Sequence, residues 1–246
     1  MPYQSLNPEK ITATVRTLHR RIQERFPDTG LAAVCGELVG LAEKAGVATD
    51  SLTRPMIALR FVSGLLAGVI VAGLGLMIFT LSTPEEGFTL VEFVQTLEAG
   101  INDVVLIGVG IFFLVSIERR LKRRKVLSAI SELRSIAHII DMHQLTKDPQ
   151  HALRKLVDTP ASPRRVFDRE ALSRYLDYCS EMLSLTGKIA ALYVQKFDDS
   201  VVLASVNEVE ALTTGLSGKI WQKLVILETG GAPLSPTTSA GSQVAR

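Results

Sequence analysis

Three of the chain's four histidines lie in one short stretch, Ala137–His151, which reads "AHIIDMHQLTKDPQH". The same stretch contains Asp141 and Asp148. Imidazole and carboxylate groups are common zinc ligands, and a histidine beside a carboxylate can also transfer protons. The residue types therefore raise the question of a metal centre or a proton-handling site.

The spacing of these residues on a helix disfavours a metal centre. Residues advance by about 100° each, so His138 and Asp141 share a polar stripe with Arg134. His143 lies about 140° away from His138 around the axis, toward the apolar face. Because zinc needs three or four converging ligands, only a helix break near His143 would gather His138, Asp141 and His143. We expect instead a helix end with local His–Asp and Arg–Asp hydrogen bonds.

The chain that carries this stretch has two long runs of apolar residues. Mean hydropathy is +0.25 although 21% of residues are charged, so the apolar residues must be concentrated. Phe61–Leu81 has no charged residue and is long enough to cross a hydrocarbon core of ~30 Å. Val104–Ile117 alone spans only ~21 Å, so its helix must extend back through Asn102 and Asp103 toward Glu98. Two membrane-spanning helices are predicted.

The charges that flank the two apolar runs favour membrane helices over two buried core helices. The connection between the runs is acidic and has no lysine or arginine. Six basic residues follow the second run: Arg119, Arg120, Lys122, Arg123, Arg124 and Lys125. The positive-inside rule then puts both termini in the cytoplasm, most simply at a bacterial inner membrane. We expect the basic cluster to set topology and to contact anionic lipid headgroups at the cytoplasmic face.

Other residues in the predicted membrane hairpin are candidates for helix packing or for a pore. Small residues at Gly64, Gly68 and Ala72 would permit close helix approach, either to the side of the second helix that carries Gly108 or to another copy of the chain. Asn102 and Asp103 stand in the outer headgroup region or, with Glu92, at the outer mouth of a pore. Ionisable groups inside a membrane are costly and often mark ion paths.

The whole chain reads as helical, and its predicted divisions are the following. Residues 1–53 form a short cytoplasmic helical hairpin, whose second helix is capped by Asp28 and stopped by Gly46. Residues 54–118 form the transmembrane hairpin, and residues 119–145 form a cytoplasmic helical extension. Residues 146–167 are mostly loop, residues 168–228 form a long antiparallel hairpin, and residues 229–246 are a disordered tail. The fold class is therefore an all-α integral membrane protein. One helix is expected to run from Leu90 to about Met142, with Ala137–His151 at its junction with the terminal hairpin.

Several function classes lack support in the sequence. The basic cluster has no accompanying aromatic motif, so nucleic acid is not an expected partner. Cys35 and Cys179 show no paired spacing for a disulfide or a zinc site. We find no nucleophile–base pair and no glycine-rich phosphate loop, so no catalytic residue and no cofactor is predicted.

Three functional hypotheses remain. The first is a non-enzymatic inner-membrane protein, oligomeric, whose cytoplasmic helical domain self-associates or docks partner proteins through the 168–227 hairpin. Its motivation is that the long helices carry apolar stripes that need partners. The alternative is an oligomeric ion channel or transporter with two transmembrane helices per subunit, although no selectivity-filter sequence is present. The weakest hypothesis is a metal-dependent enzyme at His138, Asp141 and His143.

Overall fold

The computed structural model describes residues 5–53, 90–153 and 167–230, together with 61, 62, 64, 65, 67–69, 71–73, 75 and 76. The helices are α1 (Pro8–Arg25), α2 (Gly30–Thr53), α4 (Leu90–Leu145), α5 (Pro149–Ala152), α6 (Arg169–Val194) and α7 (Ser200–Glu228). The described part of the chain contains no strand, so the all-α prediction is confirmed there. The predicted tail, most of the 146–167 connection and much of the first apolar run lie outside the described residues.

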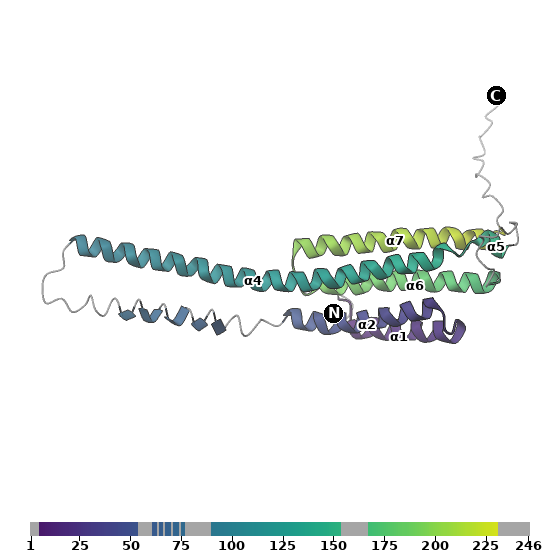
Figure 1. Ribbon diagram of the computed structural model, residues 1–246, viewed down its shortest axis with the longest axis horizontal. Helices are drawn as coiled ribbons and strands as arrows, with labels where there is room; N and C mark the ends of the chain where they lie inside the picture. Colours follow the sequence, from purple (N-terminus) through teal and green to yellow (C-terminus); the bar gives the residue numbers. More distant parts are fainter. Residues whose placement is uncertain are drawn as a thin grey trace, which may run out of the picture.

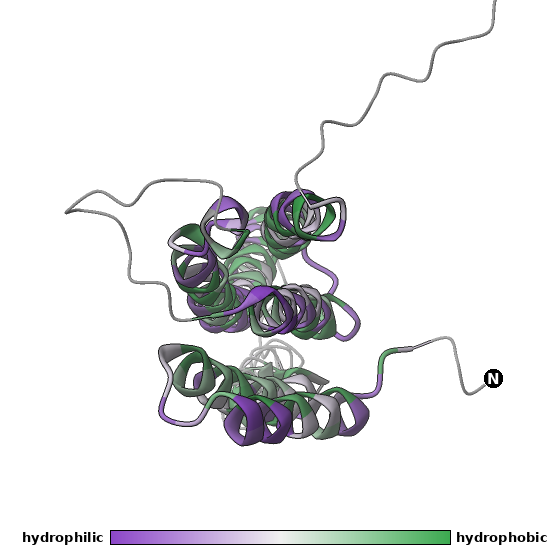
Figure 2. Ribbon diagram, turned by 90° about the vertical axis from the view of Figure 1, so that its right-hand side faces the viewer, coloured by the Kyte–Doolittle hydropathy of each residue, from purple (hydrophilic) through white to green (hydrophobic). Residues whose placement is uncertain are grey.

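The long helix α4 organises the molecule (Figure 1). Its C-terminal half lies against α6 and α7, and its N-terminal half extends beyond them. The pair α1–α2 forms a second layer, in which α2 packs on both α4 and α6, and α1 packs on α2 and α6. Viewed along the bundle, α4, α6 and α7 group together above this α1–α2 layer (Figure 2). We call the packed part, formed by α1, α2, α6, α7 and the second half of α4, the bundle.

Side-chain caps begin three of these helices. Asn7 accepts a hydrogen bond from the Lys10 N–H at 3.0 Å, just before Pro8. Asp168 accepts one from the Ala171 N–H at 2.7 Å. Asp199 accepts bonds from the first N–H groups of α7. Each cap satisfies donors that a helix start leaves without a partner, and this fixes where the helix begins.

The expected limits of the second helix are wrong at both ends. Asp28 adopts a positive φ of 54° in the turn, and the Thr29 hydroxyl accepts the capping bond from the Ala32 N–H. The helix does not stop at Gly46 but continues to Thr53. Glycine inside a helix costs about 1 kcal/mol relative to alanine, and burial of Thr49 and Leu52 beyond it offsets that cost.

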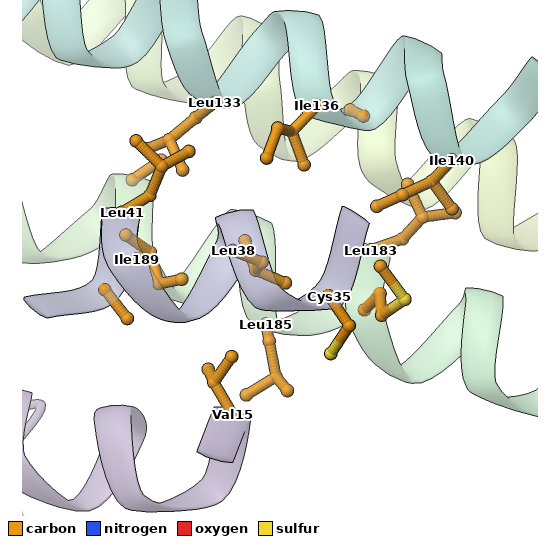
Figure 3. Close-up of a cluster of buried hydrophobic side chains, with 14 of the residues drawn as sticks. Val15, Cys35, Leu38, Leu41, Leu133, Ile136, Ile140, Leu183, Leu185 and Ile189 are labelled. Carbon is orange, nitrogen blue, oxygen red and sulfur yellow. The ribbon is translucent and has the colours of Figure 1, made fainter. Parts of the chain in front are cut away.

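The core forms where the apolar stripes of five helices meet. Figure 3 shows side chains from α1, α2, α4 and α6 converging, among them Val15, Leu38, Leu133 and Ile189. The stripes predicted on α6 and α7 are buried in this core as well, including Leu176, Met182, Val206, Val209 and Ile220. The apolar faces of the terminal hairpin therefore find their partners within the chain.

No described helix buries the N-terminal half of α4. The segment Leu97–Leu145 contains a stretch long and apolar enough to cross a membrane, and none of that stretch is buried. Phe112 is 73% exposed and Leu106 is 64% exposed. Among the described residues this is the one helix that meets these criteria. The two-helix hairpin stays a prediction, because Phe61–Leu81 is described only at scattered positions.

Candidate coupling site between the long helix and the bundle

Two polar clusters join the second half of α4 to the other helices of the bundle, one at each end of that half. The first lies where α4 leaves the bundle. Arg123 donates to Asp199 from Nε at 2.8 Å and pairs with it through Nη2 at 2.6 Å. Lys122 donates to the Leu52 carbonyl at 3.2 Å and forms an ion pair with Glu118 at 2.9 Å. We call Glu118, Lys122, Arg123 and Asp199 the proximal cluster.

Asp199 has two roles in the proximal cluster. Its Oδ1 caps α7 by accepting from the N–H groups of Val201 and Val202, while its Oδ2 accepts from Arg123. Burial of this carboxylate tends to raise its pKa, but the hydrogen bonds from Arg123 and from the two N–H groups outweigh it, so the pKa is lowered. The side chain is only 4% exposed, so α7 begins at a buried, ionised cap that is paired with α4.

The predicted basic cluster therefore divides into two groups. Lys122 and Arg123 are partly buried and join α4 to the ends of α2 and α7. Arg119, Arg120, Arg124 and Lys125 are exposed around the same turn of the helix. The sequence pattern alone gave all six the same role, since a run of basic residues does not reveal which side faces protein.

The second cluster caps the C-terminal end of α4. The Lys223 ammonium of α7 donates to the carbonyls of Gln144 and Lys147, at 2.6 and 3.1 Å. The last carbonyls of a helix lack partners inside the helix, and a cation placed there also interacts favourably with the helix dipole. Burial lowers the pKa of Lys223, while the charges of Asp148 and Asp141 oppose that shift.

The Gln144 side chain belongs to the same region. Its Nε2 donates to Asp141 Oδ1 at 2.6 Å, whereas its Oε1 is buried without a hydrogen-bond partner among the described residues. Lys147 lies over two aromatic rings, with Nζ 4.9 Å from the centroid of Phe167 and 5.3 Å from that of Tyr175. We call Asp141, His143, Gln144, Lys147 and Lys223 the distal cluster.

The histidines that drew attention in the sequence are separated in space. His138 is exposed, whereas the His143 ring packs against the start of α2, where a Cβ added to Gly30 would lie 2.4 Å from His143 Cε1. Asp141 pairs with Gln144, and Arg134 pairs with Glu208 of α7, in place of the expected His–Asp and Arg–Asp bonds. The described residues contain no group of three or more His, Cys, Asp or Glu able to hold a metal ion.

The predicted polar and packing residues of the membrane segment are exposed wherever the structure describes them. Asn102 and Asp103 are exposed on α4, and the Glu92 side chain is outside the described residues. A Cβ placed at Gly64, Gly68 or Gly108 would meet no described atom within 4 Å. The roles proposed for these residues, and for Ala72, stay predictions.

The two thiols are chemically inert. Cys35 and Cys179 are both fully buried in the core. Burial raises the pKa of each thiol to about 12. Burial therefore disfavours the thiolate form on which cysteine reactivity depends.

A groove runs along the outer face of α6. One wall comes from α1 and the residues just before it, and the other wall comes from α7. The helices α1 and α7 do not contact each other. It encloses about 890 Å³ and is lined by Leu6, Ile11, Thr14, Glu181, Leu185 and Trp221, among others. Trp221 is 63% exposed at its edge. We call this the Trp221 groove; sequence reasoning did not identify it, because Trp221 falls outside the buried stripe of α7.

Comparison of the chain with protein-family models, with characterised proteins and with solved structures gives no match. The function must therefore be inferred from the geometry of the molecule itself. That geometry contains a coupling site: α4 is connected to α2 and α7 where it leaves the bundle, and to α7 and the start of α2 where it ends.

Proposed function

We propose that this protein is a non-enzymatic, membrane-anchored helical scaffold, with the bundle on the cytoplasmic side of a bacterial inner membrane. The observation that carries the proposal is the continuity of α4 from Leu90 to Leu145. One half of this helix is apolar and exposed, and the other half is part of the core. A single helix with these two surfaces would hold the bundle at a fixed position beneath a bilayer.

The charge distribution supports the same arrangement. Arg119, Arg120, Arg124 and Lys125 are exposed at the turn where the apolar half of α4 ends. Each basic residue near an anionic leaflet contributes about 1 kcal/mol of attraction. The four exposed cations would therefore contact lipid headgroups, while Lys122 and Arg123 hold the bundle to the helix.

We further propose that the scaffold self-associates. The stripes of the 168–227 hairpin are already buried within the chain, so a second copy would bind elsewhere. Copies in one membrane point the same way, so residues of equal depth meet across their interface. Trp221 is an exposed aromatic side chain that lies beside the Trp221 groove, at the same distance from the membrane as the groove. This arrangement suits the pairing of two copies, in which the Trp221 of each copy enters the groove of the other.

Cross-linking of protein in native membrane vesicles tests this proposal. A cysteine introduced at Gln222 would form a disulfide between copies, and Trp221→Ala would reduce that product. Cysteine at Ser135, on another face of the bundle, is the matched control. Protein that stays monomeric in the membrane and co-purifies with no other chain would contradict the scaffold proposal. A co-purifying chain of another kind would favour partner docking over self-association.

One observation favours a second candidate function, an oligomeric channel or transporter. Asn102 and Asp103 are exposed on the apolar half of α4, where a charged side chain facing lipid is costly. Several copies that turn these residues toward a shared axis would remove that cost and line an aqueous path. Ion flux in proteoliposomes, lost in Asn102→Ala and Asp103→Ala, would support this function. Well-incorporated protein without flux would eliminate it.

A further inference from the structure

The contact between His143 and the first residue of α2 has properties that the scaffold function does not require. Gly30 is the first residue of α2, and the His143 ring occupies the space that any larger side chain at this position would need. The ring is partly buried, and its partner is a helix N-terminus. The first N–H groups of a helix carry a partial positive charge, so a neutral imidazole is compatible with this position and a cation is not.

Burial and a neighbouring cation both favour the neutral form of His143. Burial lowers the pKa of His143, and the charge of Lys147, four residues further along the chain and just beyond the end of α4, lowers it again. Lys223, from α7, is a second cation in the distal cluster, where it donates to the Gln144 and Lys147 carbonyls. Of the carboxylates, Asp141 accepts a hydrogen bond from Gln144, and Asp28 precedes Gly30 by two residues.

We propose that the His143–Gly30 contact is a pH-sensitive joint: α1–α2 docks firmly on α4 while the imidazole is neutral, and protonation loosens that docking. The direction of the pH effect follows from the coupling between proton binding and folding. In the unfolded chain a histidine has a pKa of about 6.5, and in the folded chain His143 has a lower pKa. The contribution of His143 to stability is therefore complete above about pH 6.5, and it is lost as the pH falls from there toward the folded-state pKa.

The consequence for the molecule is local. In the hairpin α1–α2, α2 packs on α4 and α6, while α1 packs on α6 and supplies one wall of the Trp221 groove. A looser α2 would change that wall, whereas α4, α6 and α7 also pack on one another and would stay together. Acidification would thus alter one surface of the bundle while its central helices stay packed.

Hydrogen exchange on the full-length protein in detergent micelles tests this proposal. Protection of α2, corrected for the intrinsic exchange rate, is compared with that of α6 at pH 7.5 and pH 5.5. We expect α2 alone to lose protection on acidification, by at most about tenfold per pH unit because one proton is coupled. His143→Gln should abolish this difference. His138→Gln, five residues earlier on the exposed face of α4, should retain it.

Two results would overturn the proposal. One is an equal loss of protection in α2 and α6, and the other is a loss in His143→Gln as large as in the unmodified protein. If His143→Gln fails to fold, NMR titration of the His143 ring in the unmodified protein decides the matter. A pKa below that of His138 supports the joint, and a pKa equal to it or higher contradicts it.

Discussion

The two halves of α4 belong to one helix but have opposite surroundings. In the bundle half, Val126, Leu133 and Ile140 are each no more than 2% exposed. In the apolar half, Val104, Leu106 and Phe112 are each more than half exposed, although their side chains are equally hydrophobic. Hydrophobicity alone therefore does not determine burial within a chain. The bundle half is buried because polar residues on its other face, and both polar clusters, orient it against α2, α6 and α7.

The largest expected effect comes from shortening a buried side chain of the bundle half. Leu133→Ala leaves a cavity among α2, α4 and α6, and it should lower the free energy of unfolding by about 2–5 kcal/mol. Leu106→Ala is the matched control in the apolar half, and it should change the value by less than about 0.5 kcal/mol in detergent. Chemical unfolding in micelles gives both values. Equal losses would mean that the two halves do not differ as described.

The proximal cluster gives the next largest effect. Asp199→Ala removes the cap of α7 and the partner of Arg123, and it should cost about 1–2 kcal/mol. Asp198→Ala changes an exposed carboxylate in the same connection and is the control. The pKa of Asp199 is lowered on folding, so its contribution is complete well above pH ~3.9 and is lost as the pH falls through the folded-state pKa. Unfolding at pH 6 and at pH 3 should therefore show a smaller difference between Asp199→Ala and the unmodified protein at pH 3.

The distal cluster gives a smaller effect. Lys223→Met removes the ammonium that donates to two carbonyls at the end of α4, although the Gln144 carbonyl still accepts from the Lys147 N–H. It also removes an ammonium whose burial is unfavourable. We expect a net loss of about 1 kcal/mol, with raised hydrogen exchange confined to the last turns of α4. Lys219→Met, on the exposed side of α7, is the control and should change neither quantity. A Lys223→Met protein as stable as the control would show that the distal cluster does not hold α4.

Local features of this fold could be predicted from the sequence because they depend on nearby residues. The stripe from Ile11 to Ile22 follows from periodicity, and the caps at Asn7 and Asp168 follow from hydrogen bonds within a turn. The sequence offers either Asp199 or Ser200 as the cap of α7, and the structure has Asp199 there. The continuation of α2 through Gly46 could not be predicted, because tertiary burial of Leu52 outweighs the weak helix propensity of glycine. Helix propensity alone does not include the free energy gained from tertiary burial.

The coupling site could be predicted only in part. The junction role of Ala137–His151 was predicted from its position, and the orientation of His143 toward packing was predicted from its angle on the helix. The hydrogen-bond partners at the two ends of the site could not be predicted, because they are far apart in the sequence. Arg123 and Asp199 are separated by 76 residues, and Lys223 and Gln144 by 79. One signal was present in the sequence: Lys223 lies between Ile220 and Leu227 in an otherwise apolar stripe, where a lysine requires an acceptor.

The most direct test of the account is the environment of α4 along its length. Spin labels on cysteines at Leu97, Val104 and Phe112, and at Ser128 and Ser135, would be compared in reconstituted bilayers. The native thiols can stay in place, because both are fully buried. We predict that relaxation by oxygen dominates at Val104 and Phe112, and that relaxation by a water-soluble nickel chelate dominates at Ser128 and Ser135. Chelate access at every position would contradict the central claim that one continuous helix joins a bilayer to the bundle.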